Sequence, residues 1–385
     1  MIKLHKSKKK YLFIITIIIF ISIIFLNYNN IFLYLKSITT GYNIKTIKVF
    51  NDNNIEKQIT RYSETLDEAI KQDKFNPKFL DIYYNINYQD LDNFIDLVNN
   101  LATIGYNASD INAIFANINP SNINIIINNT YDPYLGEYIK LDYFNEEKLD
   151  RYIKFSNNQE KLNYSIFFDN NTTFNALDIV TLVNANLDKE YYSNDLILTD
   201  EESNKTDAIV NKYYQLEEDF EPNNLTAIDS KYARNDSQLL QKEATEAFNQ
   251  MCSDAKLENI SLYSGSAYRS YEYQNTIYND YIKKDGLTAA ETYSARPGYS
   301  EHQLGLAVDI MNGNWSYVSK EDIEYSWLLA NSYKYGFILR YPENKEYITG
   351  YMFEPWHYRY LGKELASKVY NSGLTYDEYV ARNLN

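Results

Sequence analysis

The sequence has few of the residues that usually bind a metal or form a covalent cross-link. Among its 385 residues there are one cysteine, Cys252, and three histidines, His5, His302 and His357. A single cysteine excludes an intramolecular disulfide and a cysteine-rich metal site. Any metal must therefore be bound by histidine and carboxylate side chains.

Basic charge is also scarce outside the N-terminus. The chain has 52 acidic and 37 basic residues, and five of the basic residues are lysines within the first ten positions. An acidic body repels polyphosphate, so nucleic acid is excluded as an expected partner. With 45% hydrophobic residues, the chain has the composition of a folded protein. Its length favours two domains and a tether.

One long apolar run occurs near the N-terminus. Residues Tyr11–Leu26 are interrupted only by Thr16 and Ser22, and with their flanks they are long enough for a membrane-spanning helix. The preceding lysines predict a cytoplasmic N-terminus and an extracellular body. Residues 1–36 are thus expected to form a basic tail and a transmembrane signal anchor. A cleaved signal peptide stays open as an alternative.

Residues 37–205 are predicted to be mainly helical. Apolar residues recur there at three- and four-residue steps over residues 55–70, 91–101 and 111–118. Asp90 and Ser109 are expected to begin the second and third of these helices, and Gly105 to end the second. A further helix is expected to start at Thr173. Because this region contains no histidine or cysteine, we predict an extracellular spacer or interaction role for it.

The pattern changes near residue 206. Apolar spacing predicts a helix over residues 240–255, whereas alternation at Ile260–Ser264 and Leu306–Ile310 predicts strands. Residues 206–385 are therefore predicted to form a mixed α+β domain.

Chemically versatile residues gather in this domain. His302, Asp309 and His357 offer two imidazoles and a carboxylate, a ligand set that suits a catalytic zinc and leaves one position for water. Glu354 is expected to act as the general base, and Arg269 to stabilise an oxyanion. Each of these residue types alone is usually structural. Their joint occurrence in short segments favours a zinc site.

Three of these segments resemble a known family. Residues Ser266–Gln274, Ser300–Ile310 and Glu354–Tyr360 closely resemble the signatures of VanY-like D-alanyl-D-alanine carboxypeptidases. These are M15 zinc peptidases, whose fold is shared with lysostaphin-type peptidases and hedgehog domains. The resemblance covers roughly residues 206–385. It implies a central antiparallel sheet flanked by helices, and zinc-dependent removal of the C-terminal D-alanine from peptidoglycan stem peptides. The predicted topology places this activity at the outer face of the membrane.

The resemblance also implies roles for individual residues. The implied Zn²⁺ ligands are His302, Asp309 and His357. Glu354 matches the catalytic base, and Arg269 matches the arginine that contacts substrate and stabilises the transition state. Gln274 and Ser300 match positions that bind substrate near its terminal carboxylate.

Two other functions stay open. One is an L,D-carboxypeptidase that acts on tetrapeptide stems, because the family's metal site handles both bonds. The other is a non-catalytic protein that binds or regulates the wall. Glu354 disfavours this second alternative, since binding alone needs no general base.

Overall fold

The computed structural model describes residues 17, 28, 31–55, 57–157, 174–193 and 196–384. The chain divides after Lys140 into two compact units, which are described separately below. No helix among these residues is long and apolar enough to cross a membrane. The predicted span, Tyr11–Leu26, lies outside the described residues except for Ile17.

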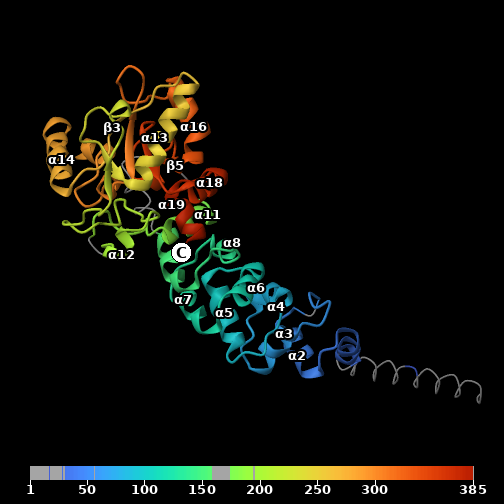
Figure 1. Ribbon diagram of the computed structural model, residues 1–385. Helices are drawn as coiled ribbons and strands as arrows, with labels where there is room; N and C mark the ends of the chain where they lie inside the picture. The colour runs from blue at the N-terminus through green and yellow to red at the C-terminus, as the bar shows by residue number, and fades with distance from the viewer. Residues whose placement is uncertain are drawn as a thin grey trace, which may run out of the picture. The chain divides into compact units, whose positions relative to one another are not determined.

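Unit 1, drawn in blue to green in Figure 1, is built from short helices. They are α2 (Ile44–Asp52), α3 (Glu64–Lys71), η1 (Pro77–Phe79), α4 (Leu80–Asn85), α5 (Phe94–Ile104), α6 (Ala108–Asn117), η2 (Pro120–Asn122), α7 (Ile123–Ile127) and α8 (Leu135–Tyr138). The predicted helical character is confirmed here. Of the helix expected over residues 55–70, only the part from Glu64 forms, because Ser63 caps α3.

The helix ends of unit 1 were only partly predicted. Gly105 follows α5 with a φ of 123°, a conformation that favours glycine, as expected for a helix stop. The predicted N-caps Asp90 and Ser109 are wrong, since Asn93 and Asn107 precede α5 and α6. The Asn107 side chain accepts the backbone N–H of Ser109 at 2.8 Å, so that helix begins before Ser109.

Unit 2 combines helices with two small sheets. Its first half contains η3 (Glu146–Lys148), α9 (Leu149–Asn157), α11 (Ala176–Asn184), α12 (Asp200–Ser203), β1 (Leu225–Ala227), η4 (Ser230–Tyr232), β2 (Leu239–Gln241), α13 (Lys242–Leu257), β3 (Tyr263–Ser266) and α14 (Tyr271–Asp285). Its second half contains α15 (Leu287–Tyr293), η5 (Glu301–Leu304), β4 (Ala307–Met311), α16 (Ile323–Asn331), η6 (Ser332–Tyr335), β5 (Phe337–Leu339), α17 (Glu346–Thr349), β6 (His357–Tyr360), α18 (Lys363–Ser372) and α19 (Tyr376–Asn383).

The larger sheet of unit 2 has the order β3-β4-β6-β5, and every neighbouring pair is antiparallel. Val308, Ile310 and Tyr358 point to one face, where they join the buried core with residues of α13 and α16. Because side chains alternate along a strand, Asp309 and His357 lie on the other face. The mixed α+β prediction is confirmed. The sheet therefore has one face for packing and one for polar side chains.

The predicted elements of unit 2 lie close to the observed ones. The helix expected over residues 240–255 is α13, and the alternation at Leu306–Ile310 is β4. The strand expected at Ile260 begins only at Tyr263, because the backbone N–H of Ile260 still donates to Ala255 and closes the end of α13. Thr173, the expected start of a further helix, lies outside the described residues, and Asn175 caps α11.

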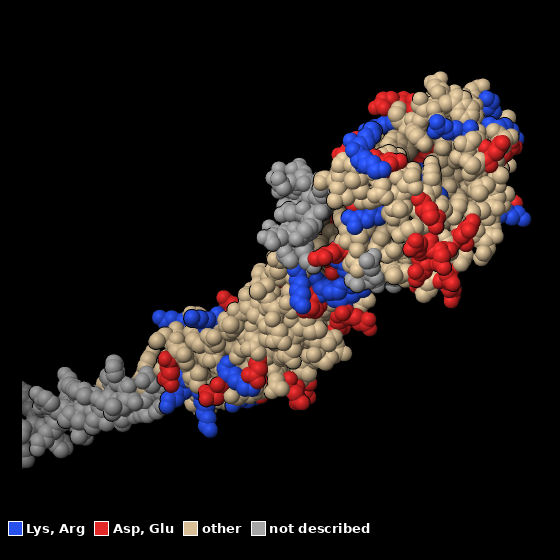
Figure 2. Space-filling view, turned by 90° about the vertical axis from the view of Figure 1, so that its left-hand side faces the viewer, with Lys and Arg blue, Asp and Glu red and all other residues tan. Residues whose placement is uncertain are grey.

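Charged side chains of both signs occur on the face of the molecule shown in Figure 2. On the face shown in Figure 2, Lys and Arg side chains lie in separate groups interspersed with Asp and Glu. A continuous basic band, the usual footprint of nucleic-acid binding, does not occur on this face.

Candidate active site

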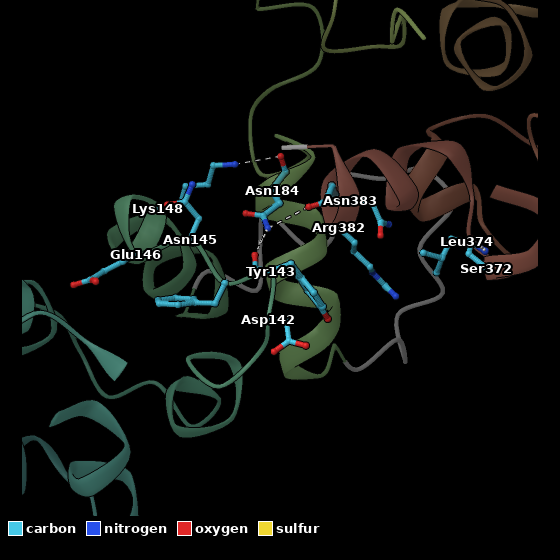
Figure 3. A pocket seen from close by; sticks show the side chains of 12 residues that line it. Asp142, Tyr143, Asn145, Glu146, Lys148, Asn184, Ser372, Leu374, Arg382 and Asn383 are labelled. Atoms are coloured by element: carbon cyan, nitrogen blue, oxygen red, sulfur yellow. Dashed lines mark hydrogen bonds between the residues drawn. The ribbon is translucent and has the colours of Figure 1, made fainter. Parts of the chain in front are cut away.

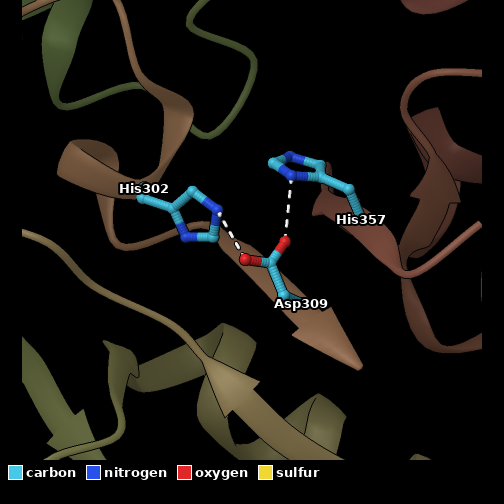
Figure 4. A group of neighbouring side chains, drawn as sticks. All are labelled: His302, Asp309 and His357. Atoms are coloured by element: carbon cyan, nitrogen blue, oxygen red, sulfur yellow. Dashed lines mark ion pairs between the residues drawn. The ribbon is translucent and has the colours of Figure 1, made fainter. Parts of the chain in front are cut away.

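The pairing of β4 with β6 brings two of the predicted ligands together. Asp309 and His357 are directly opposed in the register of the two strands, and the His357 Nδ1 atom lies 3.1 Å from the Asp309 Oδ1 atom. The third ligand, His302, comes from η5, and its Nε2 atom lies 3.3 Å from Asp309 Oδ2. Figure 4 shows both imidazoles directed at the carboxylate. His302 and Asp309, which are close in sequence, thus meet His357 from a later segment.

These three side chains have the arrangement of a metal site. One ligand atom from each lies within 4.8 Å of the others, and all three residues are buried. The Nδ1 atom of His302 lies 2.7 Å from the carbonyl oxygen of Ala267, so its Nε2 atom is the one turned toward Asp309. Among the described residues, Asp309 Oδ1 is buried without a hydrogen bond. The nitrogen next to it, His357 Nδ1 at 3.1 Å, is itself a candidate ligand atom, so a bound cation would satisfy both atoms.

A fourth buried residue, Glu301, orients His357 from behind. Its Oε2 atom lies 3.5 Å from His357 Nε2, the ring nitrogen that points away from Asp309. Its Oε1 atom accepts from Arg340 at 2.7 Å and from Arg359 at 3.0 Å. Burial alone would raise the pKa of Glu301, but the two arginines hold that pKa below its usual range. Glu301 was not among the site residues predicted from the sequence. The one signal that could have indicated its role is its position next to His302.

Glu354 lies beside the same cluster. It is 5% exposed, and its Oε2 atom is 3.6 Å from His357 Nδ1. Burial raises the pKa of this carboxyl to about 8, despite the opposing charge of His357. A carboxyl group with a pKa near neutrality can both accept and release a proton. The structure therefore places the predicted base within reach of the predicted ligands.

Arg269 is fixed by three partners. Its guanidinium donates to Ser266 Oγ at 2.8 Å, to Gln274 Oε1 at 3.4 Å and to Asp309 Oδ2 at 2.5 Å. Gln274 is buried, and its amide donates to the carbonyl of Ala295 at 2.8 Å. Gln274 thus contacts the site through Arg269 and the backbone.

Electrostatics within the cluster are strongly asymmetric. Burial and the neighbouring Arg269 lower the pKa of His302 to about 4. Burial would also lower the pKa of His357, but Asp309 and Glu301 raise it to about 9. Burial would raise the pKa of Asp309, yet His302 and Arg269 hold it well below its usual range. The acidic neighbours of His357 therefore outweigh the effect of burial on its pKa, whereas Asp309 does not outweigh burial and Arg269 at His302.

An open cavity of about 390 Å³ gives access to the cluster. Ser300, Glu354 and Arg269 line it together with the three clustered residues, and its walls are aromatic. The aromatic wall residues are Tyr281, Tyr293, Tyr317, Tyr341, Tyr351 and Trp356. Of the predicted site residues, only Gln274 is absent from the lining. A second cavity of about 660 Å³, lined in part by Lys148 and Arg382, holds none of the predicted residues (Figure 3).

Comparison with known proteins identifies relatives of this region. A family model described as "VanY: D-alanyl-D-alanine carboxypeptidase" matches residues 237–363. YodJ of Bacillus subtilis, provisionally named a carboxypeptidase, is 40% identical over 179 residues, which are 45% of this chain and 66% of YodJ. A D-alanyl-D-alanine carboxypeptidase of Enterococcus faecalis is 44% identical over 33% of this chain and 50% of its own length. The chain thus spans less than two thirds of these two relatives.

One further relative is covered almost completely. The bifunctional D-Ala-D-Ala dipeptidase and D-Ala-D-Ala carboxypeptidase VanXYC of Enterococcus gallinarum is 31% identical over 44% of this chain and 91% of its own length. Among solved structures, the LD-carboxypeptidase LdcB is 37% identical, with a TM-score of 0.46, over 50% of this chain and 94% of that chain. A VanY D,D-pentapeptidase variant in complex with Zn(II) is 34% identical, with a TM-score of 0.41. The match covers 46% of this chain and 98% of that chain.

Proposed function

Because the chain belongs to the VanY family of D-alanyl-D-alanine carboxypeptidases, we propose that it is a zinc-dependent carboxypeptidase that removes the C-terminal D-alanine from peptidoglycan stem peptides. The observation that carries this proposal is the buried cluster of His302, Asp309 and His357 beside Glu354, at the base of an open cavity. Relatives named for action on D-Ala-D-Ala support the substrate class.

His302 Nε2, a carboxylate oxygen of Asp309 and His357 Nδ1 would hold the zinc. The surroundings of the two histidine rings support this assignment. The other nitrogen of each ring already faces an oxygen, from Ala267 in one case and from Glu301 in the other, which is how metal-binding histidines are usually oriented. When bound, zinc polarises the scissile carbonyl and lowers the pKa of water.

Glu354 moves the proton in this proposal. Hydrolysis adds the hydroxyl of water to the carbonyl carbon, breaks the C–N bond before the terminal D-alanine and leaves a proton for the departing nitrogen. The Glu354 carboxylate accepts the proton that water loses and delivers it to that nitrogen. Its burial supports the role, because desolvation makes the carboxylate more basic.

Arg269 provides fixed positive charge next to the cluster. Held by Ser266, Gln274 and Asp309, its guanidinium needs little reorganisation to stabilise a developing oxyanion or the substrate's terminal carboxylate. Ser300 lines the cavity and is proposed to contact that carboxylate. Gln274 is proposed to hold Arg269 in place.

The L,D-carboxypeptidase function is the alternative, and it differs in the stem it accepts. The test is to incubate the purified full chain and zinc with defined tetrapeptide and pentapeptide stems, and to identify the products by mass spectrometry. Loss of one D-alanine from the pentapeptide supports the D,D-activity, and loss from the tetrapeptide supports the L,D-activity. Glu354→Gln is the matched inactive control. Failure to cleave either stem would contradict the enzyme proposal and favour a binding protein.

The location of the protein is proposed on the sequence alone. The lysines before Tyr11–Leu26 support an uncleaved anchor with the body outside the cell. Protease added to intact cells should then digest the body and leave an N-terminal cytoplasmic tag protected. A body that is protected until lysis would contradict an outer-face enzyme.

A further inference from the structure

The turn after β4 holds Trp315 in an unusual backbone conformation. Its φ is +60°, in the left-handed region that bulky residues rarely occupy. Backbone outliers of this kind persist only where the surroundings enforce them, and they gather at ligand-contacting sites. The conformation of Trp315 therefore calls for an explanation beyond the turn itself.

The surroundings of Trp315 do enforce this conformation. The Asn312 side-chain oxygen accepts the backbone N–H of Asn314 at 3.0 Å and of Ser316 at 3.2 Å. The backbone N–H of Trp315 donates to the Asn312 carbonyl at 3.0 Å, and the Asn312 amide donates to Asp322 at 3.0 Å. These hydrogen bonds hold the backbone of the turn in one conformation, and therefore hold Trp315 in one orientation.

That orientation presents an open aromatic surface. The Trp315 ring stacks on Tyr263 with the centroids 4.2 Å apart and the planes 18° from parallel. Trp315 nevertheless remains 49% exposed. Since Tyr263 covers one face of the indole, the exposed surface includes much of the other face. A stacked but exposed indole is suited to bind a second flat, partly apolar partner.

The aromatic surface lies on the same face of the sheet as the active-site cavity, whose lining includes Tyr317 but neither Tyr263 nor Trp315. Tyr263 is paired with Met311, which lies two residues beyond Asp309 and so on the same face of β4. Tyr317 lines the cavity, is 43% exposed, and lies against Gly265, where an added Cβ would come within 2.8 Å of the Tyr317 ring. A side chain at position 265 would therefore displace Tyr317. We call Tyr263, Trp315 and Tyr317 the aromatic platform.

We propose that the aromatic platform binds a pyranose ring of the glycan strand that carries the stem peptide, an inference that rests on the proposed function. The apolar C–H face of a pyranose packs on an aromatic ring, and its hydroxyl groups remain in water. The three platform residues carry no charge, as expected for a neutral ring. By strand geometry the platform lies on the order of 10 Å from Asp309, which an extended stem of three or four residues spans.

The inference predicts that the platform discriminates between substrates with and without sugar. The full chain with zinc is assayed on a free stem peptide and on the same peptide attached to its disaccharide. Trp315→Ala should lower the ratio of kcat/KM for the disaccharide-peptide to that for the free peptide by roughly threefold to tenfold, through KM, the size of one aromatic contact. Trp315→Phe should recover part of this loss because it keeps a ring.

Tyr370→Ala is the matched control. Tyr370 is 47% exposed and stacks on Tyr333 with the centroids 3.8 Å apart, but it comes from α18 and does not line the active-site cavity. An unchanged ratio in Trp315→Ala would overturn the proposal. The same loss in Tyr370→Ala would overturn it as well, because the effect would then follow from losing any exposed aromatic pair.

A binding experiment separates this inference from the proposed enzyme activity. The chain has three tryptophans, so the indole N–H signals of ¹⁵N-labelled protein can be assigned with Trp315→Phe. Addition of the peptide-free disaccharide should shift the Trp315 signal, whether or not the protein cleaves peptides. If wild type cleaves neither substrate, the enzyme proposal fails. The titration then still tests whether the aromatic platform binds the disaccharide. No shift of the Trp315 signal at saturating disaccharide would refute the platform.

Discussion

Replacing the buried Lys212 by methionine should change how the stability of unit 2 depends on pH. Lys212 is 1% exposed. Its ammonium donates to the carbonyl of Glu291 at 2.7 Å and lies 4.8 Å from the ring centroids of Tyr191 and Tyr351. Burial lowers the pKa of this amine to about 8, although Glu291 opposes the change. The charge is thus held at a cost in free energy.

The size and sign of that cost follow from the two pKa values. The pKa of Lys212 is 10.5 in the unfolded chain and about 8 in the folded one. This pKa difference corresponds to roughly 3 kcal/mol of stability. Below pH 8 the amine is charged in both states and the full cost is present. Between pH 8 and 10.5 the unfolded state binds more protons, so the free energy of unfolding rises with pH. Lys212→Met cannot show this rise.

Tryptophan fluorescence provides the assay, because all three tryptophans lie in unit 2. Urea unfolding of wild type and Lys212→Met would be compared at pH 7, 8, 9 and 10, with the exposed Lys256→Met as control. Burial raises the pKa of Tyr192 and Tyr351 well above 10 in the folded state, and their ionisation in the unfolded chain affects wild type and variant alike. The variant's stability relative to wild type should fall by about 2–3 kcal/mol from pH 7 to pH 10. A constant difference would refute the reasoning.

Three further predictions concern the candidate metal site. His302→Ala and His357→Ala should each lose most of the bound zinc, as measured by elemental analysis, whereas the control His5→Ala should retain it. Full zinc occupancy in the first two variants would show that these histidines are not the ligands. Glu354→Gln should keep the zinc but lose turnover by on the order of 10²–10⁴, and near-normal kcat would exclude the base role. Glu301→Gln should weaken zinc binding by about 10- to 100-fold in chelator competition; unchanged affinity would contradict the orienting role of Glu301.

The candidate ligands could be predicted because the sequence offers so few alternatives. Two histidines outside the N-terminal tail, each in a short segment with carboxylates, left little choice. The alternation around Asp309 also predicted the strand, and hence that Asp309 faces away from Val308 and Ile310. Local patterns were sufficient to predict that these three residues lie together and that Asp309 belongs to a strand.

Other parts of the site depend on contacts that no local pattern reveals. Lys212 looks like any surface lysine until the fold encloses it between Tyr191 and Tyr351. The left-handed conformation of Trp315 depends on the Asn312 side chain and on its bond to Asp322. Helix starts were also misplaced: Asn107 rather than Ser109 caps α6, and no side chain caps α5.

The buried charges behind His357 are better explained by geometry than by stability. Glu301, Arg340 and Arg359 are fully buried, and Arg340 also pairs with Asp377 at 2.5 Å. Buried ion pairs often contribute little net stability, and apolar residues of similar volume can replace them. Such a replacement here would leave the Nε2 atom of His357 facing no acceptor, and the ring would lose the contact that turns Nδ1 toward Asp309. Because Glu301 needs both arginines to stay ionised at this depth, and Arg340 in turn needs Asp377, the orientation of one ligand extends through the core to α19. Helix α19, which follows the segment matched by the family model, therefore belongs to the structure that positions the candidate metal ligands.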